Sequence, residues 1–194
     1  MPKFEDSIIN GLAKKYGEIV RKSRPNVFED IVDSIISQQL SVKAAATILD
    51  RVKSLFADRK ITPNLLLNLD DLSLRNCGMS WAKAKYAKDL ATKTLDGTLQ
   101  LDKLDQMSDQ EIIDHLVIVK GVGQWTAEMI LMFTLVRPDI FPVDDLGIQN
   151  AMCRLYNLKP TKTLKQRMQK IAKTWSPNRT LACQYLWKSL DEKE

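Results

Sequence analysis

The stretch that decides the fold runs Leu116-Val-Ile-Val-Lys-Gly-Val-Gly-Gln-Trp-Thr-Ala-Glu-Met-Ile130. An apolar helical pattern ends here, a Gly-x-Gly turn follows, and a second apolar helix begins near Gln124 to Thr126. Gly121 and Gly123 allow positive φ and leave the backbone uncovered, so an anion can approach the N–H groups at the start of the second helix. Lys120 adds positive charge beside them. A plain helix–turn–helix corner with a glycine C-cap is the alternative interpretation.

Helical periodicity extends outward from this turn over nearly the whole chain. Apolar residues recur at spacings of three and four in successive segments, and strand-like alternation is nowhere sustained. Ser108 and Glu111 fit a capping box, and another helix is expected to open near Ser80. Prolines fall between the apolar stripes, where they do not interrupt a helix. The sequence therefore predicts an all-α protein of roughly nine or ten helices.

The composition favours a folded protein with an anionic partner. Hydrophobic residues make up 44% of the 194 residues, and the net charge is +5. The three cysteines, Cys77, Cys153 and Cys183, are far apart and form no Cys-x-x-Cys pair, which argues against a disulfide framework and against zinc or iron–sulfur sites. No apolar run approaches the roughly 20 residues that span a bilayer. We expect an intracellular protein without membrane contact, in the cytoplasm or nucleoid, or in the nucleus of a eukaryote.

The hairpin and its second helix are followed by Phe141-Pro-Val-Asp-Asp-Leu-Gly-Ile-Gln149. A single aspartate at such a place is a favoured N-cap, but helix, Gly-Val-Gly turn, helix and acidic loop in this order resemble the helix–hairpin–helix (HhH-GPD) DNA glycosylase superfamily. The most similar branch is 3-methyladenine DNA glycosylase II, which repairs alkylation damage, in its compact form. Three further stretches resemble that branch: Ile36-Ser-Gln-Gln-Leu-Ser-Val-Lys-Ala-Ala45, Gly78-Met-Ser-Trp-Ala-Lys-Ala84, and Trp175-Ser-Pro-Asn-Arg179 followed by Ala182 and Tyr185-Leu-Trp187.

This resemblance implies two helical lobes in one glycosylase unit, residues 1–194, with a DNA-binding cleft between them. One lobe is expected to cover about residues 38–145, with the hairpin at 116–130. The other is expected to combine residues 1–37 and 146–194. The implied partner is double-stranded DNA with a damaged base, and we expect a monomer.

The resemblance also implies a base-excision-repair enzyme that flips an alkylated base, of the 3-methyladenine or 7-methylguanine type, and hydrolyses its N-glycosidic bond. Asp145, directly before Leu-Gly, is the expected catalytic carboxylate. Asp144 is the alternative and otherwise the expected helix cap. Bifunctional members carry a lysine where this chain has Trp125, so hydrolysis without strand cleavage is predicted. A glycosylase for uracil, mismatched thymine or oxidised purine, and a noncatalytic DNA-binding helix–hairpin–helix module, are the alternatives.

The remaining site residues follow from the same resemblance. Trp125 is expected to stack on the flipped base, with Trp187 and Tyr185 as further pocket aromatics, whereas Trp175 is expected in the core. Leu40 is the predicted wedge that fills the gap left in the duplex. The expected DNA contacts are Gln38, Gln39, Leu40, Ser41, Lys83, Lys120, Gly121, Val122, Gly123 and Thr126. No cofactor is expected to be required, but backbone carbonyls of Val117, Val119 and Val122 are implied ligands of a structural Na⁺ or K⁺ ion. His115 is expected to be structural.

Overall fold

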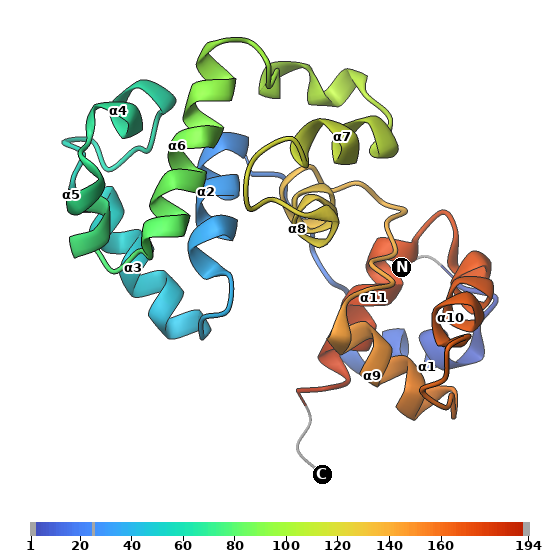
Figure 1. The fold of residues 1–194 in the computed structure, drawn as a ribbon. Coiled ribbons are helices and arrows are strands. Elements are labelled where there is room, and N and C mark those ends of the chain that lie inside the picture. The colour runs from blue at the N-terminus through green and yellow to red at the C-terminus, as the bar shows by residue number, and fades with distance from the viewer. Residues whose placement is uncertain (1–2, 25, 192–194) are drawn as a thin grey trace. The chain divides into compact units, whose positions relative to one another are not determined.

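The computed structural model describes residues 3–24 and 26–191, and it contains helices and connections but no strand within those ranges. The all-α prediction is therefore confirmed. These residues form eleven α-helices, α1 to α11 (Figure 1), where the sequence predicted roughly nine or ten. The excess comes from short helices such as α4 (Pro63–Asn68) and α5 (Asp71–Asn76), which are too short to show helical periodicity. None of the described helices is both long enough and apolar enough to cross a lipid bilayer.

The chain divides into two compact units. We call residues 24–130 the hairpin unit and residues 1–23 with 131–194 the terminal unit. Besides α4 and α5, the hairpin unit contains α2 (Val27–Ser37), α3 (Val42–Ser54), α6 (Trp81–Leu95), the 3₁₀ helix η1 (Leu101–Gln106), α7 (Asp109–Leu116) and α8 (Gln124–Met129). The terminal unit contains α1 (Ser7–Tyr16), α9 (Leu146–Leu155), α10 (Leu164–Ala172), the 3₁₀ helix η3 (Lys173–Trp175) and α11 (Arg179–Lys188). The chain passes from the terminal unit to the hairpin unit at 23/24 and back at 130/131, where the π-helical turn η2 (Ile130–Thr134) begins.

The core of the hairpin unit forms around α6, which packs against α2, α4 and α5. Ala84, Ala87, Leu90 and Ala91 form the buried stripe of α6, at the spacing expected for one helix face. Ser80 caps α6 by accepting a hydrogen bond from the backbone N–H of Lys83. The predicted start of this helix is confirmed, and so is the capping box of Ser108 and Glu111 at the start of α7.

The core of the terminal unit forms around α11, which packs against α1 and α9. Trp175 is buried in this unit, as predicted, and its indole Nε1 donates to Oδ2 of Asp6 over 3.0 Å. Asp6 also caps α1, accepting hydrogen bonds from the backbone N–H groups of Ile8 and Ile9. A single carboxylate therefore ties the first helix of this unit to the segment before α11.

The boundaries between the units differ from those predicted at 37/38 and 145/146. They fall at 23/24 and 130/131. Helix α2 packs on α3 and α6, so its apolar stripe is buried inside the hairpin unit. The segment 131–145 belongs to the terminal unit because Thr180, at the start of α11, binds it. The Thr180 backbone N–H donates to Pro138 O over 3.0 Å and its hydroxyl to Arg137 O over 2.7 Å.

Candidate active site and nucleic-acid interface

The hairpin between α7 and α8 depends on one glycine more than on the other. Gly121 has a φ of +80°, and a Cβ built on it would lie 2.1 Å from Cδ2 of the Tyr86 ring. Gly123 is the N-cap of α8, with an extended φ of −96° and ψ of 177°, and a Cβ there would meet no atom within 4 Å. The positive φ that the sequence allowed at both glycines is used only at Gly121. Gly121 is therefore required by both its backbone conformation and the close approach of Tyr86.

A tight turn at residues 37–40, the wedge turn, follows α2. Gln38 has φ and ψ of −51° and 126°, Gln39 has a positive φ of 59°, and the Leu40 N–H donates to Ser37 O over 3.1 Å. These values describe a type II β-turn. Leu40 is 40% exposed and lies outside α2, so it does not end the buried stripe of that helix. An exposed apolar side chain at a turn has the position that a wedge requires.

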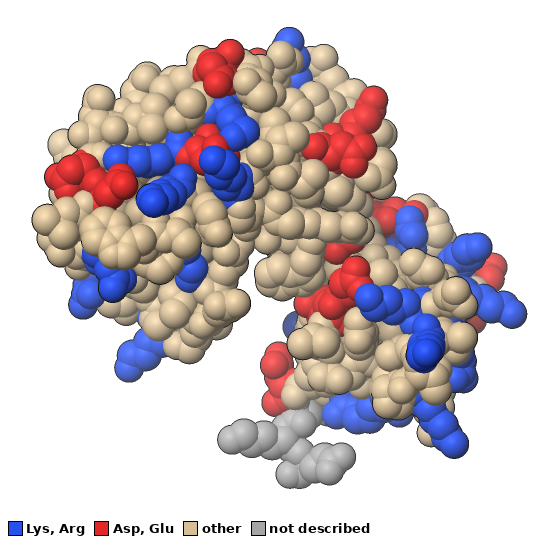
Figure 2. Space-filling view, viewed as in Figure 1, with Lys and Arg blue, Asp and Glu red and all other residues tan. Residues whose placement is uncertain are grey.

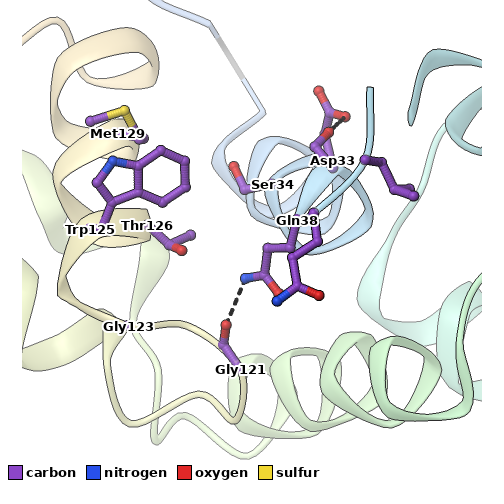
Figure 3. Close-up of a pocket in the computed structure, with 11 residues that line it drawn as sticks. Asp33, Ser34, Gln38, Gly121, Gly123, Trp125, Thr126 and Met129 are labelled. Carbon is purple, nitrogen blue, oxygen red and sulfur yellow. Dashed lines mark hydrogen bonds between the residues drawn. The ribbon is translucent and has the colours of Figure 1, made fainter. Parts of the chain in front are cut away.

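The wedge turn and the hairpin form the walls of one pocket in the hairpin unit. Nε2 of Gln38 donates to Gly121 O over 2.8 Å and so joins the two segments. The pocket has a volume of about 610 Å³ and is lined by Asp33, Ser34, Ser37, Gln38, Gln39, Leu40, Gly121, Gly123, Trp125, Thr126 and Met129. In Figure 3, Trp125 and Met129 lie on one side and Gln38 and Asp33 on the other. This arrangement brings together most of the residues predicted to contact DNA.

Trp125 offers an exposed ring at this pocket. It is 44% exposed at the first turn of α8, whereas Thr126, the next residue, is buried. An indole this exposed is not packed in the core, so one of its faces is open to stacking. Asp33 is a pocket residue that the sequence analysis missed. Burial raises the pKa of its carboxyl, although a hydrogen bond from Ser37 opposes this. The sequence signal for Asp33 is that it is the one acidic residue in the otherwise mostly apolar stretch Ile31-Val-Asp-Ser-Ile-Ile36 of α2.

Lys83, a predicted DNA contact, donates hydrogen bonds within the hairpin unit. Its ammonium donates to Ile36 O over 2.8 Å and to Gln38 O over 2.6 Å. Burial lowers the pKa of this ammonium. Both carbonyls lie at the end of α2, where the last turn of a helix leaves acceptors without intrahelical donors. Lys83 therefore completes the hydrogen bonding of that helix end.

The other predicted DNA contacts are Ser41 and Val122, which have structural roles, and Lys120, which is exposed. Ser41 caps α3 and accepts a hydrogen bond from Ala44 N, and Val122 is buried, with its N–H donating to Val119 O. Lys120 is exposed, and its backbone N–H donates to Oδ2 of Asp89 over 2.9 Å. It borders a groove of about 590 Å³ lined by Ala82, Lys85, Tyr86, Lys88, Asp89, Thr92 and Lys120. Figure 2 shows Lys and Arg side chains over α6 with Asp and Glu side chains among them.

Asp145, in the terminal unit, is held by two hydrogen bonds to one of its oxygens. It is the N-cap of α9, and Oδ1 accepts from Ile148 N over 2.8 Å and from Nε1 of Trp187 over 2.9 Å. Asp144 is exposed and pairs with Lys165. The expectation that Asp144 caps the helix is therefore wrong, because the cap is the same residue that we expect to be catalytic.

Trp187 is half-buried beside Asp145 and Phe133. The ring centroids of Phe133 and Trp187 are 5.7 Å apart and their planes meet at 34°. A Cβ on Gly147 would lie 3.0 Å from Nε1 of Trp187 and 3.1 Å from Oδ1 of Asp145. The absence of a side chain at Gly147 is what lets the indole approach the carboxylate this closely.

Tyr185 and His115 both have structural positions. Tyr185 is fully buried, and its hydroxyl donates to Gly17 O over 3.0 Å. It offers no exposed face for a base, which corrects the expectation that it lines the pocket. Nε2 of His115 accepts a hydrogen bond from Gln100 N over 2.8 Å, as suits its predicted structural role.

Backbone oxygens are the groups that could hold a cation at the hairpin. Within the described ranges, no group of three His, Cys, Asp or Glu side chains could hold a metal ion. Of the three predicted carbonyl ligands, that of Val119 already accepts a hydrogen bond from Val122 N. A carbonyl has two lone pairs and can still contribute one to a cation. The Na⁺ or K⁺ site at Val117, Val119 and Val122 stays a prediction.

A family profile and individual relatives both match this sequence. The profile of the HhH-GPD superfamily base excision DNA repair proteins matches residues 32–177. DNA-3-methyladenine glycosylase 1 of Schizosaccharomyces pombe is 35% identical over 185 residues, which cover 91% of this chain and 81% of that protein. YfjP of Bacillus subtilis, provisionally named a DNA-3-methyladenine glycosylase, is 35% identical over 172 residues. That match covers 86% of this chain but only 60% of YfjP.

Solved structures agree with the sequences. A DNA-3-methyladenine glycosidase from Bacillus halodurans has a TM-score of 0.86 and 36% identity, covering 96% of this chain and 86% of that one. The 3-methyladenine DNA glycosylase of S. pombe, solved in complex with abasic DNA, has a TM-score of 0.86 and 33% identity, covering 97% of this chain and 93% of that one. The chain belongs to the HhH-GPD superfamily of base excision DNA repair proteins, among relatives named DNA-3-methyladenine glycosylases.

Proposed function

We propose that this protein is a DNA glycosylase that hydrolyses the N-glycosidic bond of alkylated purines, with Asp145 as its catalytic carboxylate. The observation that carries the proposal is the fixed position of Asp145. Hydrogen bonds from Ile148 N and from Nε1 of Trp187 orient its Oδ1. An anion oriented before the reaction stabilises developing positive charge without the cost of reorganisation.

The reaction needs one carboxylate because the substrate supplies a good leaving group. An alkylated purine is cationic, so it takes the bonding electrons of the C1′–N bond and departs as a neutral base. Positive charge then develops on the sugar, as in glycoside hydrolysis, and Asp145 stabilises it. A water oxygen bonds to C1′, and its proton passes to the carboxylate or to solvent. The products are a free base and an abasic sugar.

Recognition of the base rests on Trp125. An electron-rich indole attracts a cationic ring above its face, by about 2 kcal/mol or more when the pair is desolvated. Trp125 is exposed at a pocket of about 610 Å³, a size within the range of sites for small molecules. Leu40, exposed at the wedge turn, enters the stack where the base has left.

DNA is held by contacts to its phosphates. Backbone N–H groups at the hairpin approach the phosphodiester beside Gly121 and Gly123. Lys85 and Lys120 line a groove next to the same hairpin and supply cations there, whereas Lys88 in that groove pairs with Asp71. Contacts of this kind are independent of sequence and weaken as salt rises. They suit an enzyme that must act at any base step, in whichever compartment holds the DNA.

Two further features belong to the proposal. A Schiff base with the sugar needs an amine, and position 125 holds an indole, so the strand stays intact after base release. A Na⁺ or K⁺ ion on the carbonyls of Val117, Val119 and Val122 would stiffen the hairpin. The ion is tested by comparing the DNA affinity in Na⁺, K⁺ and tetramethylammonium chloride at one ionic strength. Equal affinity in the three salts would exclude it.

The experiment that tests the function is base release from defined duplexes. We expect release of 3-methyladenine and 7-methylguanine from methylated DNA, with intact strands until alkali is added. Duplexes with uracil, mismatched thymine or an oxidised purine are the comparison. Release from one of these alone would change the specificity but keep the enzyme class. Duplex binding without release from any substrate would instead identify a noncatalytic DNA-binding module.

A further inference from the structure

The wedge turn and the hairpin are joined through Gly121. Gln38 extends from the turn and its Nε2 donates to Gly121 O, and the two residues are 83 positions apart in the sequence. Tyr86 of α6 packs against the same glycine, so closely that no Cβ could be added there. Asp89, also on α6, accepts a hydrogen bond from the backbone N–H of Lys120. The hairpin is therefore held by the wedge turn at one point and by α6 at two.

Lys83 fixes the other side of the wedge turn. Its ammonium donates to Ile36 O and Gln38 O, 47 and 45 residues away in the sequence. The same residue, Gln38, thus accepts from Lys83 through its carbonyl and donates to Gly121 through its side chain. The turn needs this support, because the positive φ of Gln39 is unfavourable for a non-glycine residue. Hydrogen bonds to an ammonium are stronger than neutral ones and can offset that strain.

We propose that Gln38 and Lys83 are positioning residues that join the wedge turn and the hairpin into one rigid piece, fixing the spacing between the base step that Leu40 enters and the phosphates that the hairpin holds. The inference rests on the proposed glycosylase function. Neither residue touches the reacting atoms. Their effect is to hold Leu40 in place before DNA arrives, so that binding energy is not spent on ordering the turn. Without the joint, the hairpin still binds duplex DNA but the base is extruded less often.

This role separates from the obvious alternative by its salt dependence. If Lys83 bound a phosphate, its loss would reduce the slope of log K against log salt by about 0.9. A positioning residue leaves that slope unchanged and lowers only the flipped population. Lys83→Met removes the ammonium donor and keeps a side chain of similar length. Gln38→Leu does the same for the bond to Gly121, and Gln38→Glu places an acceptor against the Gly121 carbonyl.

The experiment measures three quantities on the full chain. The salt slope comes from fluorescence anisotropy with undamaged duplex. Flipping comes from the fluorescence of 2-aminopurine placed beside a 7-methylguanine on a 2′-fluoro sugar, which resists hydrolysis. The rate of base release comes from single turnovers with saturating enzyme. We expect Lys83→Met and Gln38→Leu to keep the slope, to lose most of the 2-aminopurine signal, and to slow release by about 10–100-fold. Gln38→Glu should be slower than Gln38→Leu. Lys103→Met, in η1, is the matched control and should match wild type throughout.

A double-mutant cycle tests whether the two residues act through one joint. The double variant Lys83→Met with Gln38→Leu should lose less than the sum of the two single losses, because either change alone breaks the joint. A slope reduced by about one unit in Lys83→Met would identify a phosphate ligand and overturn the proposal. Full flipping in Gln38→Leu would overturn it as well. If thermal unfolding shows that Lys83→Met is not folded, the two Gln38 variants decide alone. Flipping and salt slope need no base release, so they stay informative if the proposed function fails.

Discussion

The indole Nε1 of Trp187 donates a hydrogen bond of 2.9 Å to Oδ1 of Asp145. The same oxygen accepts the backbone N–H of Ile148, so a side chain from α11 and the start of α9 fix one carboxylate together. Trp187→Phe keeps an aromatic ring beside Phe133 and removes the donor together with part of the indole. A charge-assisted hydrogen bond contributes about 1.5–3 kcal/mol, so we expect kcat to fall by about 10–100-fold. The affinity for abasic duplex should not change. Unchanged kcat in Trp187→Phe would show that this hydrogen bond has no part in the reaction.

Trp125 should discriminate between cationic and neutral bases. Trp125→Leu keeps apolar contact and removes the π face, so release of 7-methylguanine should slow by about 10–30-fold, as expected for the loss of up to about 2 kcal/mol of cation–π energy. Affinity for undamaged duplex, whose bases are neutral, should change much less. The measurements are the single-turnover rate of 7-methylguanine release and the Kd for undamaged duplex, with Trp125→Phe as the intermediate variant. An equal loss in both would assign Trp125 to packing alone.

The two hairpin glycines should respond differently to alanine. Gly121→Ala introduces a Cβ 2.1 Å from the Tyr86 ring on a backbone with positive φ. We expect a loss of about 1–3 kcal/mol in the free energy of unfolding and weaker duplex binding. Gly123→Ala, with open space and extended φ, should fold like wild type. Tyr86→Ala combined with Gly121→Ala should recover the steric part of the loss but not the strain. Equal stability of the two single variants would contradict the described hairpin.

Asp139 predicts an acid-sensitive contribution to stability. Burial alone would raise the pKa of its carboxyl, but hydrogen bonds from Arg179 and Ser176 outweigh burial and hold the pKa below the ordinary 3.8. The unfolded chain then binds more protons than the folded one. The stabilisation is therefore complete above about pH 3.8 and is lost as the pH falls through the lower folded pKa.

Asp139→Asn should remove that contribution at neutral pH. The side chains of Asp139 and Arg179 are both partly exposed. We therefore expect the free energy of unfolding to fall by about 1–2 kcal/mol at pH 7, with a flatter acid limb in its pH profile. Urea unfolding between pH 2.5 and pH 7 measures both. Asp144→Asn is the control, because its pair with Lys165 is exposed and should contribute less than about 1 kcal/mol. An acid limb identical to wild type in Asp139→Asn would assign the loss to another carboxylate.

Features that depend on neighbouring residues in the chain could be predicted from sequence. The capping box of Ser108 and Glu111, the cap at Ser80 and the turn at Gly121 follow local rules, and the structure confirms them. The stacking role of Trp125, whose ring is exposed, stays a prediction. The cleft expected between the two lobes stays a prediction.

Features that depend on distant residues could not be predicted. Lys83 looks like a surface cation in sequence, but its acceptors lie 47 and 45 residues earlier. Tyr185 was predicted from sequence to be a pocket aromatic, but its side chain is buried and its hydroxyl donates to Gly17 O. Adjacent aspartates carry no local signal to show which one caps α9, because either can adopt an extended backbone before a helix. In the folded chain Asp145 is the cap, and it also accepts a hydrogen bond from Trp187, 42 residues away.

The most direct test of the central claim compares Asp145→Asn with Asp144→Asn. Release of 3-methyladenine and 7-methylguanine from methylated duplex is measured in single turnovers, alongside affinity for abasic duplex. Asparagine retains an acceptor for Ile148 N and for Trp187 but carries no charge. We predict that Asp145→Asn binds DNA like wild type and releases base at least about 100-fold more slowly, a loss of about 2.7 kcal/mol or more in transition-state stabilisation. Asp144→Asn should release base at the wild-type rate. Normal release by Asp145→Asn, or loss of release only in Asp144→Asn, would contradict the assignment.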